Sequence, residues 1–196
     1  MKRTVFHTVK ATDDKDAIIR DAPFLCVDKA DELEEKVEWL GDGYYFWETF
    51  ESLAHWWGKV RYLYRGSDYI ICKTIFVCPE EDLLDLVGNT EQIQDIQMMV
   101  EEIKKNPVYA APKYSAQFII NFIRLKTPFH YKAIRAWGRD ASRDKSITQH
   151  IYYFDNKASI HLNPEIQICV IDRNVLKLPM EICYCSEEDS MDCWTV

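Results

Sequence analysis

Residues 40–48 read Leu40-Gly41-Asp42-Gly43-Tyr44-Tyr45-Phe46-Trp47-Glu48. Two glycines around one acidic residue predict a tight turn, and the aromatic residues behind it predict a strand that enters a short helix over residues 48–57. Glycine permits the backbone angles and the close approach that a bound flat ring or phosphate requires. An aromatic core strand behind a tight turn explains the same residues, so this stretch alone leaves a ligand pocket and a core strand as alternatives.

The composition is typical of one globular domain. The chain has 196 residues, of which 47% are hydrophobic and 13% aromatic, and this is enough to bury a core. We therefore expect a single α+β domain over residues 1–196, with a helical and loop insertion at about residues 80–150. The net charge of −8 argues against a broad electrostatic contact with a nucleic-acid backbone.

Neither a membrane anchor nor a secretory leader is expected. The apolar runs fall far short of the roughly 20 residues that span a bilayer, and Met1-Lys2-Arg3 leads directly into a strand pattern. Seven cysteines without a Cys-x-x-Cys pair are typical of free thiols in a reducing compartment. Cys183 and Cys185, with Cys193 further on, are spaced as on one strand face rather than as zinc ligands, so we expect a cytoplasmic protein without a metal site.

Residues 3–9 have the pattern of a strand, because β-branched and aromatic side chains dominate them. Alternation along a strand places His7 on the same face as Val5 and Val9. A histidine on such a face is more often a satisfied core residue than a ligand contact.

A second strand is expected near the other end of the chain, over residues 163–172. Pro164 opens it, and polar and β-branched residues alternate behind the proline. Glu165 and Gln167 lie two positions apart, so both are expected on one face of the sheet.

Turn and capping residues predict further elements between these strands. Strands are expected over residues 62–65 and 69–77, and a short acidic helix over residues 80–87. Two longer helices are expected over residues 90–106 and 115–125. Asn89 or Thr90 is the expected cap of the first long helix, and Pro107 is its expected end.

After Pro128 the chain becomes basic. Its cations alternate with aromatic residues and are Lys132, Arg135, Arg139, Arg143 and Lys145. A solvated loop is one explanation, and contact with the pyrophosphate of a dinucleotide or with an acidic target is another.

The glycine and aromatic stretch resembles the middle signature of the ADP-ribosyltransferases of the poly(ADP-ribose) polymerase and diphtheria-toxin type. That signature is Gly-x-Gly-x-Tyr-Phe before a short helix, and residues 41–46 match it. Phe6-His7 resembles the first signature, with a helix pattern at residues 16–19, although Thr8 stands where the family usually has glycine. The strand at residues 163–172 resembles the third, with Gln167 at the position of the family's catalytic glutamate.

The resemblance implies a fold in which a split, mostly antiparallel sheet holds NAD. Tyr45 and, eleven residues later, Trp56 would cover the two faces of the nicotinamide ring, next to Gly43. The backbone N–H and C=O of Thr8 would hold the carboxamide, while its β-branched side chain crowds the pocket. His7 would orient the ribose and the carboxamide.

The resemblance also implies a catalytic set of Gln167, Glu165 and His7. Cleavage of the nicotinamide–ribose bond leaves positive charge on the sugar, and a nearby carboxylate stabilises it. Gln167 can hydrogen-bond the ribose 2′-hydroxyl but carries no charge. Either Glu165 supplies the charge, or catalysis relies more on positioning.

The implied function is that of a mono-ADP-ribosyltransferase, which cleaves NAD and transfers ADP-ribose to a macromolecular acceptor, either protein or nucleic acid. Without the glutamate, elongation into a polymer is not expected. Free-standing transferases of this shape serve as toxins or effectors, so an antitoxin or inhibitor is an expected partner. An NAD glycohydrolase and a non-catalytic NAD-binding module are the alternatives.

Overall fold

The computed structural model describes residues 1–27, 38–109, 115–138, 150–153 and 158–187. Seven of its strands form one sheet in the order β4-β5-β8-β2-β1-β3-β9. They are β1 (Lys2–Lys10), β2 (Tyr44–Glu48), β3 (Tyr69–Val77), β4 (Leu83–Asp85), β5 (Ala133–Trp137), β8 (Ile166–Val170) and β9 (Glu181–Cys185). Among these described strands, β4 and β5 pair in parallel and the other neighbours pair antiparallel. The expected α+β class with a mostly antiparallel sheet is confirmed.

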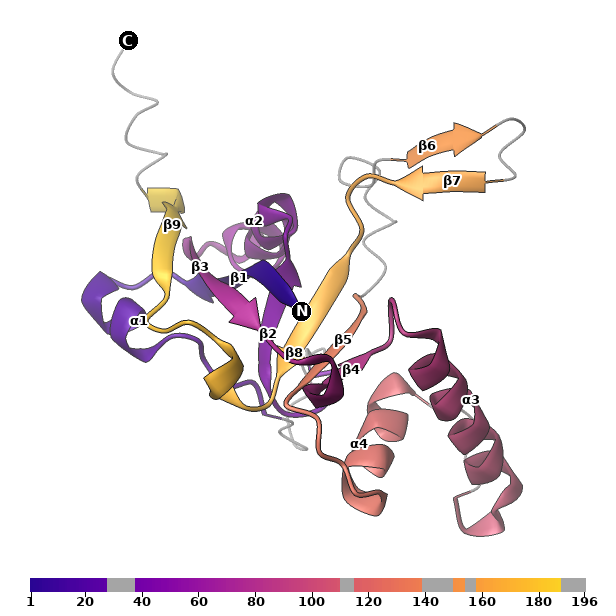
Figure 1. The fold of residues 1–196 in the computed structure, drawn as a ribbon. Helices are drawn as coiled ribbons and strands as arrows, with labels where there is room; N and C mark the ends of the chain where they lie inside the picture. Colours follow the sequence, from indigo (N-terminus) through magenta and orange to yellow (C-terminus); the bar gives the residue numbers. More distant parts are fainter. Residues whose placement is uncertain (28–37, 110–114, 139–149, 154–157, 188–196) are drawn as a thin grey trace.

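Four helices accompany the sheet in the described ranges: α1 (Lys15–Asp21), α2 (Glu51–Arg61), α3 (Thr90–Lys105) and α4 (Ala116–Lys126). Figure 1 shows α3 and α4 together beside β4 and β5, whereas α2 lies at the side of β1 and β3. A separate hairpin of β6 (His150–Tyr153) and β7 (Ala158–His161) projects away from the sheet (Figure 1).

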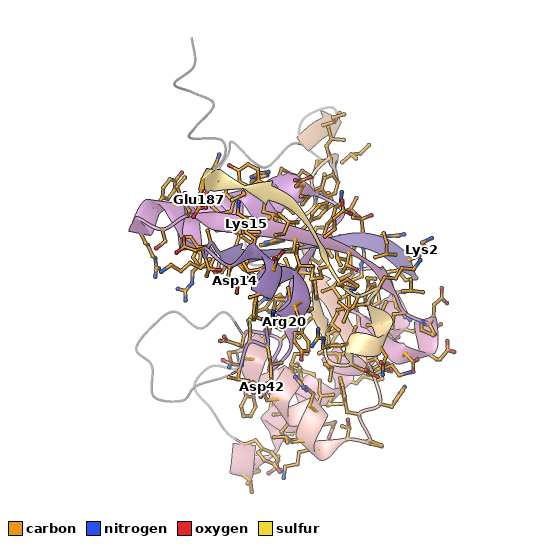
Figure 2. The ribbon with its side chains drawn as sticks, turned by 90° about the vertical axis from the view of Figure 1, so that its left-hand side faces the viewer. Lys2, Asp14, Lys15, Arg20, Asp42 and Glu187 are labelled. Carbon is orange, nitrogen blue, oxygen red and sulfur yellow. The ribbon has the colours of Figure 1, made fainter. Side chains whose placement is uncertain are left out.

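Side-chain caps begin three of these helices. Asn89 accepts from Gln92 N–H at 3.1 Å at the start of α3, and Ser115 accepts from Phe118 N–H at 3.0 Å at the start of α4. Asp14 accepts from Ala17 N–H at 2.8 Å and caps α1, along which Figure 2 shows Asp14, Lys15 and Arg20. The two long helices predicted over residues 90–106 and 115–125 are therefore confirmed.

Three predicted elements are wrong in type or extent. α2 begins at Glu51 and runs to Arg61, so the strand expected at residues 62–65 is replaced by a 3-10 turn, Leu63–Arg65. The acidic helix expected at residues 80–87 is also absent from the described chain, where a 3-10 turn leads into β4. Leu83 and Leu84 are buried there against β5, because a sheet position removes both leucines from water.

The basic stretch after Pro128 is not a solvated loop where the structure describes it. Arg135 lies on β5 with only 8% of its surface exposed. It donates to both carboxylate oxygens of Glu48, at 2.6 and 3.2 Å, and through another nitrogen to Asp85 at 3.0 Å. Arg3 adds a further hydrogen bond to Glu48 at 3.0 Å. This buried network joins β1, β2, β4 and β5 on one face of the sheet.

Candidate functional site

The sheet opens between its two central strands. β1 pairs with β3 over nine residue pairs and β2 pairs with β8 over four, but the described pairing of β1 with β2 is limited to Val5–Glu48 and Phe6–Trp47. At the far end of the opening, Cys26 and Gly43 exchange two backbone hydrogen bonds of 3.0 Å. The two strands therefore separate beyond Phe6, and a distant segment occupies the end of the gap.

The backbone of Thr8 faces this opening. Thr4 C=O accepts from Thr49 N–H on the β2 side, whereas Ala11 N–H donates to Asp68 on the β3 side, both at 2.9 Å. Because hydrogen-bonding directions alternate along a strand, the N–H and C=O of Thr8 point to the β2 side, as those of Thr4 do. The described β1–β2 ladder ends before Thr8, so these two groups are directed into the gap.

A cavity of about 360 Å³ lies at the opening. Its described lining is Phe6, His7, Thr8, Val9, Lys10, Phe24, Cys26, Glu38, Tyr45, Phe46, Trp47, Trp57, Arg61, Tyr62 and Gln167. Four residues predicted from separate parts of the sequence, namely His7, Thr8, Tyr45 and Gln167, thus meet in one cavity.

His7 connects the two sides of the opening. Phe24 N–H donates to its Nε2 at 3.3 Å, so Nε2 is unprotonated, and Nδ1 carries the hydrogen that is donated to Tyr45 C=O at 2.9 Å. Burial lowers the pKa of His7 below 6.5, against the opposing effect of the Tyr45 hydrogen bond. The neutral ring packs against Phe46 with centroids 5.4 Å apart. Both of its nitrogens are hydrogen-bonded within the protein, so His7 joins β1 to Tyr45 on β2 and to Phe24.

Tyr45 forms a buried wall of the cavity, with 8% of its surface exposed. Its hydroxyl donates to Gly41 C=O at 2.7 Å and accepts from Leu40 N–H at 2.9 Å. Burial is the main reason that the pKa of this phenol is raised. The two hydrogen bonds hold the ring in place, and Gly41 supports them with a backbone φ of +81°.

Of the two adjacent tryptophans on α2, Trp57 is among the described lining residues and Trp56 is not. Trp57 lines the cavity, whereas the Trp56 ring meets the Trp47 ring edge-on with centroids 6.0 Å apart. Gly43 is also outside the described lining, and its role is close packing, because a Cβ there would lie 2.4 Å from Cys169 Sγ. No pattern in the sequence distinguished Trp57 from Trp56, because Arg61, one helical turn after Trp57, is identified as a lining residue only by the structure.

Gln167 and Glu165, the two polar residues of the third signature, do not lie at the same site. Gln167 lines the cavity, and its Oε1 accepts from the indole N–H of Trp39 at 2.7 Å. Glu165 is buried and precedes β8, which begins at Ile166, and it is not among the lining residues that the structure describes. Strand alternation therefore does not carry Glu165 to the site.

Three charged residues that were not predicted from the sequence also line the cavity. Lys10 follows Thr8 on the same strand face, and Arg61 ends α2. Glu38, an acidic residue, lines the cavity from the turn before Gly41. No local pattern distinguishes Glu38 from the many other acidic residues in that part of the sequence.

The described part of the basic stretch is used elsewhere. Lys132 donates to Asp82 at 2.9 Å, which raises the pKa of the lysine, and Arg135 is in the buried network. Arg139, Arg143 and Lys145 lie outside the described residues. Within the described ranges, no three metal-ligating side chains come together, and no helix has the length and apolar character to cross a membrane.

Comparison with protein families, characterised proteins and solved structures gives no match.

Proposed function

We propose that this chain binds NAD in the cavity between β1 and β2 and transfers its ADP-ribose unit to a macromolecular acceptor. The observation that carries the proposal is the meeting of His7, Thr8, Tyr45 and Gln167 at a gap in the sheet. These residues come from three strands and were selected from the sequence because each lies in a stretch that resembles a signature of the ADP-ribosyltransferases. If these residues belonged only to ordinary core strands, a gap between β1 and β2 at this point would not be expected.

The apolar end of the cavity suits nicotinamide. Tyr45 and Trp57 offer aromatic surface to a flat ring. The Thr8 N–H and C=O, directed into the gap, match the acceptor and donor of a carboxamide. The Thr8 hydroxyl does not compete for the ligand, because it donates to Ala54 C=O at 3.0 Å.

The other end suits a pyrophosphate. Lys10 and Arg61 both line the cavity, and Phe6 to Lys10 spans about 13 Å at roughly 3.3 Å per strand residue. A ring bound near Phe6 therefore leaves room for a ribose before the phosphates reach these two cations. Arginine and lysine are the side chains that most often bind phosphate.

The cleavage step resembles glycoside hydrolysis. Nicotinamide leaves with the bonding electron pair, and the ribose carries the developing positive charge. Gln167 lies in the cavity as an uncharged hydrogen-bonding group that can orient the sugar. The pentosyl unit then passes to the acceptor.

The test is incubation of the purified protein with labelled NAD, alone and with a cell lysate. Label that becomes attached to a macromolecule in the lysate supports the transferase. Nicotinamide release at the same rate without lysate indicates the hydrolase, and binding without turnover indicates a binding module. Protein that neither binds nor cleaves NAD overturns the proposal.

A further inference from the structure

We infer that Glu38 supplies the carboxylate that faces the reacting sugar. This inference rests on the proposed function and adds a residue that the resemblance does not assign. Among the described residues that line the cavity, Glu38 is the one with an acidic side chain. Gln167 is uncharged, and Glu165 does not line the cavity.

Glu38 lies in a turn that is hydrogen-bonded to the walls of the cavity. Gly41 N–H donates to Glu38 C=O at 2.9 Å and closes the turn. The adjacent Trp39 donates to Gln167 Oε1 at 2.7 Å, and Leu40 N–H donates to the Tyr45 hydroxyl at 2.9 Å. The turn is thus fastened to two lining residues, one on β8 and one on β2.

The charge of Glu38 acts inside the cavity. The pKa of Cys26, another lining residue, is raised to about 11, mainly by burial and further by the Glu38 carboxylate. Glu38 is half-buried, and within the described residues no cation lies within ion-pair distance of it. A partly desolvated carboxylate stabilises a nearby cation more strongly than one in bulk water.

The reaction balances with this assignment. The bond between the anomeric carbon and the nicotinamide nitrogen breaks, and its electron pair neutralises the pyridinium ring. The Glu38 carboxylate stabilises the resulting oxocarbenium-like sugar. A hydroxyl, amine or thiol of the acceptor then bonds to the anomeric carbon, and its proton passes to Glu38 and on to solvent. No oxidant or reductant is consumed.

The experiment compares wild-type protein with Glu38→Gln, Glu38→Asp and Glu165→Gln in two measurements. One is the rate of nicotinamide release with lysate present as acceptor, and the other is the Kd for labelled NAD. Asp42→Asn is the matched control, because it removes an equal charge from the same turn at an exposed position that does not line the cavity.

We expect Glu38→Gln to lower kcat on the order of a hundredfold while Kd changes by less than about threefold, because the charge acts on the transition state. Glu38→Asp keeps the charge and should fall between the parent and Glu38→Gln. Should Glu38→Gln fail to fold, Glu38→Asp decides alone, since a lowered kcat at unchanged Kd supports the assignment and a parental kcat overturns it.

Parental turnover in Glu38→Gln, or a loss confined to Glu165→Gln, overturns the assignment of Glu38 and leaves the proposed function intact. Wild-type protein that does not turn over NAD overturns both. If Glu38→Gln and Asp42→Asn lower kcat equally, the assignment of Glu38 is also overturned, because the effect would then come from the total charge of the turn.

Discussion

Replacement of His7 by alanine tests whether this residue holds the opening of the sheet. The change removes the hydrogen bonds to Tyr45 C=O, at 2.9 Å, and from Phe24 N–H, at 3.3 Å. A buried carbonyl left without its partner costs about 1–3 kcal/mol, and the partly exposed N–H costs less. The lost ring also leaves a cavity against Phe46, so we expect the free energy of unfolding to fall by about 3–5 kcal/mol.

The assay is urea denaturation followed by tryptophan fluorescence, with His130→Ala as control. His130 is an exposed histidine, so its removal should change the unfolding free energy little. A loss in His7→Ala of less than about 0.5 kcal/mol would refute the reasoning, because the buried hydrogen bond to Tyr45 C=O cannot then depend on this ring.

The same variant gives a pH dependence of known sign. Burial lowers the pKa of His7 in the folded state, so the unfolded chain binds a proton at a higher pH than the folded one does. Neutral His7 makes its full contribution to the free energy of unfolding above pH 6.5, and this contribution is lost as the pH falls below that value. We expect the difference between wild type and His7→Ala to shrink between about pH 8 and about pH 5.5. A constant difference would contradict the proposed protonation state.

Three further predictions concern the walls and the frame of the site. Trp57→Ala should weaken NAD binding severalfold, because a stacked ring contributes about 0.5–1.5 kcal/mol beyond area burial. Trp56→Ala should leave the Kd for NAD nearly unchanged. Isothermal titration calorimetry measures the Kd of both variants. Glu48→Gln should lower the free energy of unfolding by about 3 kcal/mol in denaturant titrations, because Arg135 keeps its buried charge, and a loss below about 0.5 kcal/mol would show that the network contributes nothing. Ser115→Ala should cost about 1 kcal/mol through the lost cap of α4, and an unchanged thermal midpoint would contradict that role.

Elements with local signals could be predicted from the sequence. Asn89, one of the two expected caps, predicts the start of α3 because a cap bonds to a backbone group only three residues away. The alternation of residues 3–9 predicts β1 and the face shared by Val5, His7 and Val9. Four residues that line the cavity, His7, Thr8, Tyr45 and Gln167, could likewise be predicted, because they lie in short motifs.

The contacts between these elements depend on residues that lie far apart in the sequence. Arg135 bonds to Glu48, which is 87 residues away, and Trp39 bonds to Gln167, which is 128 residues away. A charged residue in a sequence is expected in water, since its burial is favourable only when a distant strand brings the opposite charge. For the same reason Glu38 could not be distinguished from its acidic neighbours, nor Trp57 from Trp56. Which side chain reaches the cavity depends on how β1, β2 and β8 pair and on where that pairing stops, and no short-range pattern records either.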